Sequence, residues 1–301
     1  MKVLLTGGSG QLGRALLASV PAGVEVVAPS SAELDLTRST DARRWLRESA
    51  AGLVINAAAY TLVDSAEDEP ETTFAVNERG AATIAGAAAA AGARMIHLST
   101  DFVFDGRATA PYGPDAPTAP LGVYGASKRA GELAVLAATG GQAAVVRTAW
   151  LYDAVGRNFF TTMLRLLRER GTVAVVSDQT GSPTAASSLA IAIWRIAADV
   201  AVTGIHHWTD RGETTWAGFA AAIERLARDR GLLQSSATVR AISTADYPTR
   251  ARRPAYSVLD CTATSQALGL QPRDWLVALE EVVLERAGIE ARSTWPRSAP
   301  E

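Results

Sequence analysis

Short apolar runs alternate with helix-like stretches through the first half of the chain. Each run is bounded by glycine, proline or polar residues, which predicts strands buried on both faces of a sheet. The predicted strands are residues 3–5, 24–28, 53–56, 94–99 and 143–147. The stretches between them are rich in Ala, Leu, Arg and Glu, and they predict helices over 11–19, 40–49, 71–91 and 124–138. The alternation indicates an α/β fold with a Rossmann-type, doubly wound parallel sheet.

The pattern loosens after Trp150. Further predicted elements are a helix over 158–170, a strand over 173–176, a turn-rich segment over 177–184, helices over 187–198, 215–230 and 275–287, and an arginine-proline loop over 247–254. The polar, proline-containing residues 293–301 are expected to fray. We therefore expect a Rossmann domain over 1–150 and a smaller C-terminal lobe over 151–301, with some segments of that lobe returning to the first domain.

Composition narrows the class of protein. A 301-residue chain that is 48% hydrophobic can bury a large core, and a net charge of −2 gives no general attraction to nucleic acid or to an anionic membrane. One cysteine, Cys261, and three histidines leave no disulfide framework or cysteine-cluster zinc site. The N-terminus has neither a secretory signal pattern nor a membrane-length apolar span. We expect a cytoplasmic protein without a nucleic-acid or membrane partner.

A glycine-rich loop follows the first predicted strand and opens the first predicted helix. Gly7, Gly10 and Gly13 form G-x-x-G-x-x-G around Gln11 and Leu12. Such a loop allows a tight turn and lets the backbone approach a pyrophosphate at the positive end of a helix. The alternative is a turn selected only for compactness.

The end of the second predicted strand bears on which nicotinamide binds. A dinucleotide fingerprint of the NAD type places an acid there, whereas this chain has Pro29, Ser30 and Ser31. With Arg14 at the end of the glycine loop, we expect NADPH or NADH, with a lean toward NADPH. The alternative for Arg14 is a solvated helix residue.

Tyr124 and Lys128 stand four residues apart and share a face if their segment is helical. A lysine charge near the phenol is expected to lower the pKa of Tyr124, which could then protonate an alkoxide during carbonyl reduction. Thr100 lies at the end of the fourth strand, where its hydroxyl could orient the substrate carbonyl. Surface pairing and turn formation are the alternatives for these residues taken singly.

Longer motifs show a resemblance that spans most of the chain. They are TGGSGQLG at 6–13, VINAAAYT at 54–61, STDFVFDG at 99–106, PLGVYG at 120–125, RTAWLY at 147–152, DQTGSPT at 178–184 and YPTRARRP at 247–254. With these motifs the chain resembles the extended short-chain dehydrogenase/reductases and, within them, the dTDP-4-dehydrorhamnose reductases. STDFVFDG and DQTGSPT are far more specific than the glycine loop or the Tyr-Lys pair.

The resemblance implies a set of site residues and makes the C-terminal lobe substrate-binding. Thr100, Tyr124 and Lys128 would be catalytic. The cofactor would be bordered by Gly7, Gly10, Gln11, Leu12, Gly13, Arg14, Ser30, Asp35, Leu36, Asn56, Ala57, Ala58, Tyr60, Asn77 and Ser99, together with Tyr124 and Lys128. The dTDP-sugar would meet Thr100, Asp101, Phe102, Trp150, Arg250 and Arg253.

Departures and rival functions stay open. Some members of the family are dimers bridged by magnesium through glutamates, and the corresponding positions here are Ala15 and Ser187. We expect no bound metal and a monomer or weak homodimer.

The expected reaction is reduction of the C4 ketone of dTDP-4-dehydro-6-deoxy-L-mannose to dTDP-L-rhamnose. The alternatives are reduction of another dTDP-4-keto-deoxysugar, a non-catalytic nucleotide-binding subunit, or a dehydratase or epimerase, for which Asp101 and Asp105 would matter.

Overall fold

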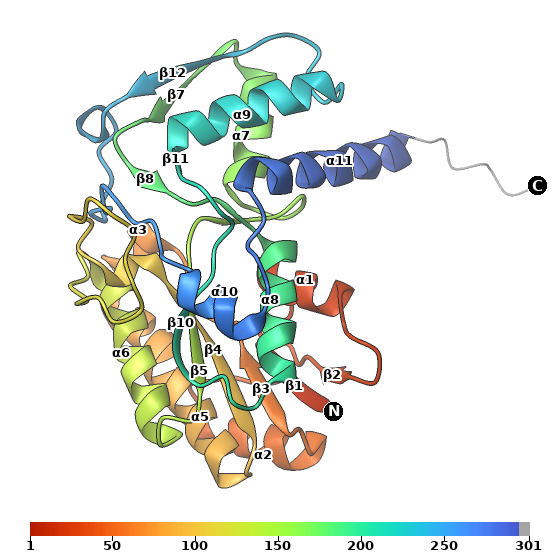
Figure 1. Cartoon of the computed structure of the whole chain (residues 1–301), viewed down its shortest axis with the longest axis vertical. Coiled ribbons are helices and arrows are strands. Elements are labelled where there is room, and N and C mark those ends of the chain that lie inside the picture. The colour runs from red at the N-terminus through yellow and green to blue at the C-terminus, as the bar shows by residue number, and fades with distance from the viewer. Residues whose placement is uncertain (295–301) are drawn as a thin grey trace, which may run out of the picture.

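The computed structural model describes residues 1–294 and has two parts (Figure 1). A parallel sheet covered by helices forms one end of the molecule, and a smaller helical lobe with short strands forms the other. The sequence prediction of an α/β fold with a parallel sheet is confirmed. The predicted fraying of 293–301 concerns residues that lie mostly outside the described part, since only Ser293 and Thr294 fall within it.

The main sheet has six parallel strands in the order β2-β1-β3-β4-β5-β10. Their bounds are β1 Lys2–Thr6, β2 Glu25–Val27, β3 Leu53–Asn56, β4 Arg94–Thr100, β5 Ala144–Thr148 and β10 Gly204–His207. Strand order reverses between β1 and β3, and ligands in open α/β sheets bind outside the carboxyl ends of strands at such a point. The topology therefore places a ligand site beside Thr6 and Asn56.

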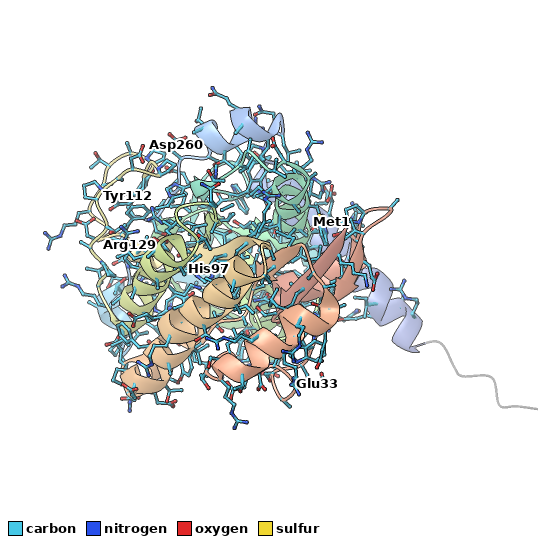
Figure 2. All side chains as sticks on the ribbon, turned by 90° about the horizontal axis from the view of Figure 1, so that it is seen from below. Met1, Glu33, His97, Tyr112, Arg129 and Asp260 are labelled. Atoms are coloured by element: carbon cyan, nitrogen blue, oxygen red, sulfur yellow. The ribbon has the colours of Figure 1, made fainter. Side chains whose placement is uncertain are left out.

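Alternate residues of each central strand pack against opposite helical layers. Val3 and Leu5 of β1 face one layer, and Leu4 faces the other, as the two-residue period of a strand requires. The first layer holds α1 Gln11–Ala18 and α8 Ala186–Ala198. The second holds α2 Ser39–Ser49, α5 Ala81–Ala90 and α6 Val123–Ala138. Figure 2 shows these three helices side by side.

The helix predicted over 71–91 is three consecutive segments. They are α4 Pro70–Phe74, a π-helical turn η1 Ala75–Gly80, and α5. The π-helical turn carries Asn77 toward the loop after β3, where its side chain bonds the backbone of Tyr60 at both N–H and carbonyl. Such turns occur often at functional sites, and this one braces the segment that follows a central strand.

The smaller lobe is built on three helices and two strands. These are α7 Phe159–Glu169, α9 Trp216–Asp229 and α11 Trp275–Thr294, with β7 Thr172–Val176 paired in parallel with β12 Thr238–Ile242. Phe160, Leu164, Phe219, Ile223 and Leu279 are buried in its core. Asn158 caps α7 by accepting the Thr161 N–H at 3.0 Å, which explains why the helix begins at Phe159.

Short elements connect the two parts. They are α3 Val63–Ala66, η2 Asp101–Val103, β6 Leu151–Tyr152, β8 Thr180–Gly181, β9 Thr184–Ala185, β11 Thr214–Thr215, η3 Thr244–Asp246 and α10 Thr262–Leu268. Beyond residue 150, α8 and β10 nevertheless join the main sheet and its helical layer. The boundary between a domain over 1–150 and a lobe over 151–301 stays a prediction.

Candidate active site

The glycine loop after β1 forms a cradle in which side chains would not fit. Gly7 has φ +73°, and its carbonyl accepts the Gly10 N–H at 3.0 Å. A Cβ atom on Gly7 would lie 2.7 Å from backbone atoms of Ala57 and Ala58. A methyl group on Gly13 would overlap the Gly7 carbonyl oxygen. The loop thus presents bare backbone at the start of α1, which fits the phosphates of a dinucleotide.

A hollow of about 210 Å³ continues from this loop. Its lining includes Pro29, Ser31, Asp35, Leu36 and Ala58. Hydrogen bonds from the hydroxyl and N–H of Thr37 lower the pKa of Asp35, so a carboxylate faces the hollow. Asp35 therefore lies beside the glycine loop, as the resemblance implies, although the second predicted strand itself ends without an acid.

Two predicted cofactor residues, Ser30 and Arg14, do not line this hollow. Ser30 donates its hydroxyl to Glu33 at 2.7 Å and does not line the hollow. Arg14 donates to the Ser9 carbonyl at 2.7 Å and pairs with Asp153 at 3.3 Å, on the wall of a different, larger cleft. Arg14 therefore stays beside the glycine loop, and its contact with the cofactor stays a prediction.

The larger cleft has a volume of about 750 Å³ and begins at the same glycine loop. Gly7, Gly10, Gln11, Leu12, Arg14, Ala57 and Ala58 line its start, and Ser99, Thr100, Asp101, Phe102, Tyr124, Lys128, Trp150 and Arg253 line its continuation. Most predicted site residues therefore share one cleft. Asn56, Tyr60, Asn77 and Arg250 do not contribute to its lining.

Buried polar side chains brace the strand ends behind the cleft. Asn56 accepts a hydrogen bond from the Thr6 hydroxyl at 2.6 Å, and its amide nitrogen lies 3.1 Å from Nδ1 of His97. Asn77 donates to the Ser127 hydroxyl oxygen at 3.0 Å. The structure thus gives Asn56 and Asn77 supporting contacts within the protein.

Thr100, Tyr124 and Lys128 meet where β4 ends and α6 begins. Tyr124 and Lys128 are one turn apart on α6, and the Lys128 ammonium donates to the Leu98 carbonyl at 2.6 Å. The Thr100 hydroxyl donates to the Asp101 carboxylate at 3.0 Å and accepts the Phe102 N–H at 3.2 Å. Gly125 lets α6 approach this close, since a Cβ there would overlap the Phe102 carbonyl oxygen.

Removal from water dominates the proton affinities of the site. It raises the pKa of Tyr124 to about 12, while the hydrogen bond from Thr100 opposes the rise and the charge of Asp101 adds to it. Burial likewise lowers the pKa of Lys128 to about 8, against the raising effect of Glu132. The expectation of a lowered pKa for Tyr124 is wrong, because burial of the phenol outweighs the lowering effect of Thr100.

The two candidate acids for dehydratase or epimerase chemistry differ in placement. Asp101 lines the cleft, and burial raises its pKa to about 6, with a hydrogen bond from Ser257 opposing the rise. Asp105 instead accepts the Tyr112 hydroxyl at 2.7 Å and the Arg107 N–H at 3.1 Å, away from the cleft lining. Only Asp101 of the pair is positioned near Tyr124.

A buried ionic network centred on Glu132 interacts electrostatically with Lys128. The Glu132 carboxylate accepts hydrogen bonds from Nε and Nη2 of Arg147, each at 2.8 Å, and from the Ser99 hydroxyl at 2.5 Å. Ser99 therefore lines the cleft while its hydroxyl is committed to Glu132. Neither Glu132 nor Arg147 was predicted as a site residue, because a Glu and an Arg on separate elements give no local signal of pairing.

The two arginines expected to contact the dTDP-sugar, Arg250 and Arg253, differ in position. Arg253 lines the cleft and pairs with Asp64 at 2.7 Å. Arg250 forms an exposed ion pair with Asp68. The cleft also contains Arg157, Phe159, Leu189 and Trp216, which the sequence analysis missed. The aromatic residues stand at helix starts, where a sequence pattern indicates packing in the core.

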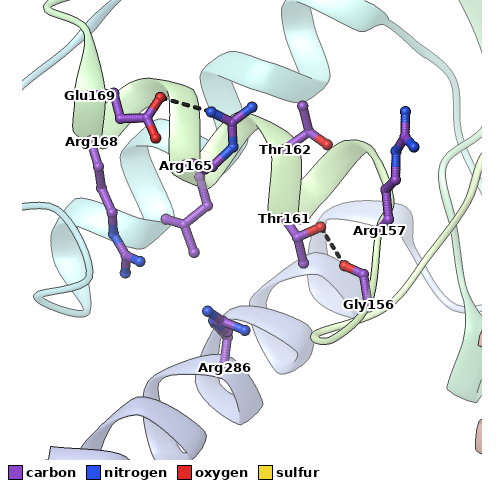
Figure 3. A pocket seen from close by; sticks show the side chains of 9 residues that line it. Gly156, Arg157, Thr161, Thr162, Arg165, Arg168, Glu169 and Arg286 are labelled. Atoms are coloured by element: carbon purple, nitrogen blue, oxygen red, sulfur yellow. Dashed lines mark hydrogen bonds and ion pairs between the residues drawn. The ribbon is translucent and has the colours of Figure 1, made fainter.

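A second hollow of about 580 Å³ lies between α7 and α11 (Figure 3). Arginines dominate its lining, with Arg165 paired to Glu169 at 2.8 Å and Arg286 paired to Glu290 at 2.7 Å. Arg157 borders both this hollow and the cleft. None of the Thr100, Tyr124 and Lys128 side chains reaches this hollow, so the candidate active site is the larger cleft.

Comparisons with known proteins agree with this site. The family described as RmlD substrate binding domain matches residues 1–287. The chain belongs to this family. A dTDP-4-dehydrorhamnose reductase from Burkholderia thailandensis is 41% identical to this RmlD-family chain over 290 residues, which cover 93% of this chain and 97% of the relative.

Two further relatives bear on cofactor and substrate. The crystal structure of dTDP-4-dehydrorhamnose reductase from Bacillus anthracis in complex with NADP matches with a TM-score of 0.89 and 33% identity, covering 94% of the present RmlD-family chain and 99% of that chain. A Streptomyces antibioticus protein named as a probable dTDP-4,6-dihydroxy-2-methyloxan-3-one 4-ketoreductase is 40% identical, covering 93% of this chain and 94% of its own.

Residues 1–294 contain no group of three or more His, Cys, Asp or Glu side chains arranged to hold a metal ion. A metal shared between two copies of this RmlD-family chain would draw ligands from both, so the expected absence of a bridging metal stays a prediction. Over the same residues no helix has the length and apolar character needed to cross a membrane.

Proposed function

We propose that the chain reduces the C4 ketone of dTDP-4-dehydro-6-deoxy-L-mannose with NADPH or NADH and forms dTDP-L-rhamnose. One observation carries the proposal: Thr100, Tyr124 and Lys128 line a single cleft that runs to the glycine loop at the start of α1. That arrangement brings a dinucleotide-binding loop and a proton donor to one substrate. The named activities of relatives about 40% identical over more than nine-tenths of the chain support the same reaction.

The glycine cradle and the hollow beside Asp35 and Leu36 would hold the dinucleotide. When bound, the reduced nicotinamide supplies a hydride to the carbonyl carbon. The phenol of Tyr124 donates its proton to the carbonyl oxygen, and the resulting phenolate regains a proton from water through the cleft. The Thr100 hydroxyl donates a hydrogen bond to the same oxygen, where negative charge develops.

Lys128 has two roles in this scheme. Its ammonium would hold the ribose of the nicotinamide and would stabilise the phenolate left after proton transfer. The buried Glu132 favours the charged form of Lys128, since its negative charge raises the pKa of that lysine. The Leu98 carbonyl fixes the ammonium in place.

The sugar nucleotide would occupy the remainder of the cleft. Trp150 and Phe102 provide apolar surface there, and Asp101 provides a hydrogen-bonding carboxyl group. Arg253, with Arg250 at the rim, would bind the pyrophosphate. Each guanidinium would then leave its present carboxylate partner, Asp64 for Arg253 and Asp68 for Arg250, and bond phosphate oxygens. We further assign the protein to the cytoplasm, as a monomer or weak homodimer without a bridging metal.

The second candidate function is reduction of another dTDP-4-keto-deoxysugar, and the 40% identical ketoreductase from Streptomyces antibioticus supports it. A non-catalytic subunit has less support, since the chain retains Thr100, Tyr124 and Lys128 in one cleft.

The test is the absorbance of reduced nicotinamide in mixtures of purified protein with freshly generated dTDP-4-dehydrorhamnose and either NADPH or NADH. We expect oxidation of the cofactor and formation of dTDP-L-rhamnose, identified by chromatography and mass. Oxidation with a different keto-sugar but not with this one would favour the second candidate function. Binding of the cofactor without its oxidation in the presence of any keto-sugar would favour the non-catalytic subunit.

A further inference from the structure

Three aromatic side chains form one wall of the cleft, and we refer to Trp150, Phe159 and Trp216 as the aromatic wall. The indoles of Trp150 and Trp216 are stacked, with centroids 3.5 Å apart and planes 6° from parallel. Phe159 packs on Trp216 at 4.5 Å. Stacked aromatic pairs contribute beyond the area they bury, so these contacts hold the rings in fixed relative positions.

The backbone of Trp150 is strained. Its φ is +47°, and within residues 1–294 only Ala50 is another non-glycine residue with a positive φ. A large side chain in this region has an energetic cost and persists only where surrounding contacts impose it. The stack with Trp216 is one such contact, since it fixes the indole that the strained backbone presents to the cleft.

Gly181 provides the second contact. A Cβ atom at this position would lie 2.5 Å from Cε2 and 2.7 Å from Nε1 of Trp150, so a side chain there would displace the indole. The φ angle of Gly181 is not positive, and its backbone does not need a glycine for conformational reasons. Glycine is therefore required here by the closeness of Trp150.

The short strand pair of β8 and β11 connects Gly181 to the start of α9, where Trp216 lies. Gly181 of β8 lies opposite Thr214 of β11, and Thr180 lies opposite Thr215. Thr215 then caps α9 by accepting the Gly218 N–H at 3.1 Å, and Trp216 is the first residue of that helix. The β8–β11 pair thus sets the position of Trp216 relative to the glycine against which Trp150 rests.

From this geometry we infer that Trp216 and Gly181 are positioning residues for recognition of the nucleotide-sugar substrate. They act through Trp150 by holding its indole as a rigid wall of the sugar-binding part of the cleft. The inference rests on the proposed function, because it assigns that part of the cleft to a dTDP-linked keto-sugar. It predicts that disturbing the stack weakens sugar binding and leaves cofactor binding unchanged.

The experiment compares three variants with the wild type. Trp216→Leu removes the stack, Trp216→Phe keeps an aromatic ring, and Trp275→Leu is the matched control. Trp275 packs against the same core of the smaller lobe and contacts Phe219, but it does not line the cleft. We expect the KM for the keto-sugar to rise about tenfold in Trp216→Leu, the scale of one lost aromatic pair. The dissociation constant of the cofactor should remain unchanged, and Trp216→Phe should restore most of the affinity.

A spectroscopic readout is independent of turnover. Two stacked indoles couple their electronic transitions and give a paired signal of opposite signs in circular dichroism. Trp150→Phe and Trp216→Phe should each abolish this signal, Gly181→Ala should alter it, and Trp275→Phe should leave it intact. Gly181→Ala should also raise the KM for the sugar, because its methyl group displaces Trp150.

The outcomes separate the inference from the function on which it rests. Turnover by the wild type with equal KM changes in Trp216→Leu and Trp275→Leu would overturn the inference alone. An unchanged KM in a folded Trp216→Leu, or a paired signal that survives Trp216→Phe, would do the same. Absence of turnover by the wild type with every dTDP-4-keto-sugar would overturn the proposed function, and the substrate role of Trp216 with it, whatever the dichroism shows.

Discussion

Tyr124 keeps its proton at neutral pH, because burial raises its pKa to about 12. A protonated phenol is a proton donor, as reduction of a carbonyl requires. Tyr124→Phe should therefore lower kcat by on the order of 10² or more, through loss of the general acid. The measurement is steady-state oxidation of the reduced cofactor at pH 7. The dissociation constant of the cofactor serves as the control for intact folding, and a rate close to that of the wild type would remove Tyr124 from the mechanism.

The pH dependence of kcat/KM should reveal the ionisation of Lys128. Burial lowers its pKa to about 8, so its ammonium loses a proton as the pH rises through that value. If the charged lysine is required, kcat/KM for the reduced cofactor should be flat between pH 6 and 7 and should fall above about pH 8, since this parameter reports groups of the free enzyme.

Glu132 offers a control for that assignment. Its negative charge raises the pKa of Lys128, so Glu132→Gln should move the falling limb to lower pH. A limb that stays in place in this variant would belong to another group. The comparison uses the folded fraction of each protein, measured by far-ultraviolet circular dichroism at every pH.

Single residues also show how far sequence reasoning reached into the site. Thr100, Tyr124 and Lys128 could be predicted together because long motifs surround them, and the structure places all three on one cleft. Their local electrostatics could not be predicted, since the pKa of Tyr124 depends on burial that spacing does not reveal. Trp216 was missed for a similar reason: only the fold brings it against Trp150.

At the scale of elements, periodicity located most helices and strands to within a few residues. Strand β12 Thr238–Ile242 and helix α10 Thr262–Leu268 were not predicted either, and two further exceptions have clear physical causes. The π-helical turn Ala75–Gly80 has the same composition as the helices that flank it, so no pattern separates the three segments. Strand β10 has only four residues, two of them histidines, and it was not predicted because it lacks a run of apolar residues.

Gly13, at the junction of β1 and α1, and Gly86, within α5, should respond in opposite ways to substitution by alanine. A methyl group on Gly13 would overlap the Gly7 carbonyl oxygen, whereas one on Gly86, exposed within α5, meets nothing within 4 Å. Gly13→Ala should lower the free energy of unfolding by about 1–3 kcal/mol, the usual range for forced overpacking. Gly86→Ala should raise it by about 0.5–1 kcal/mol through higher helix propensity.

Thermal and urea unfolding of the two variants would measure both effects. Gly13→Ala should also weaken cofactor binding, because the loop must shift to admit the methyl group. Equal stabilities of Gly13→Ala and Gly86→Ala would contradict the close packing of the loop against α1.

For the whole molecule, the pair of Arg147 and Glu132 joins several elements at the centre of the fold. Arg147 of β5 contacts Glu132 of α6, the Pro114 carbonyl and His207 of β10. Arg147→Met should lower the free energy of unfolding by about 3–5 kcal/mol, because it leaves a buried carboxylate without its main partner. Urea unfolding followed by tryptophan fluorescence would measure the change.

A double variant separates charge from packing. If the uncompensated charge causes the loss, Arg147→Met combined with Glu132→Gln should be more stable than Arg147→Met alone. Equal stability of the single and double variants would assign the loss to side-chain packing around Phe104, whose ring lies 5.1 Å from the guanidinium carbon.

The return of α8 and β10 to the sheet has a consequence for protein engineering. A chimera made by joining residues 1–150 to the C-terminal half of a relative would replace the edge strand paired with β5 and the helix packed on α1. Both are parts of the dinucleotide-binding layer, and α10 adds Leu268 to the same core. Transplanting sugar selectivity from one reductase to another therefore calls for exchange of discontinuous segments, with α8, β10 and α10 retained from the host.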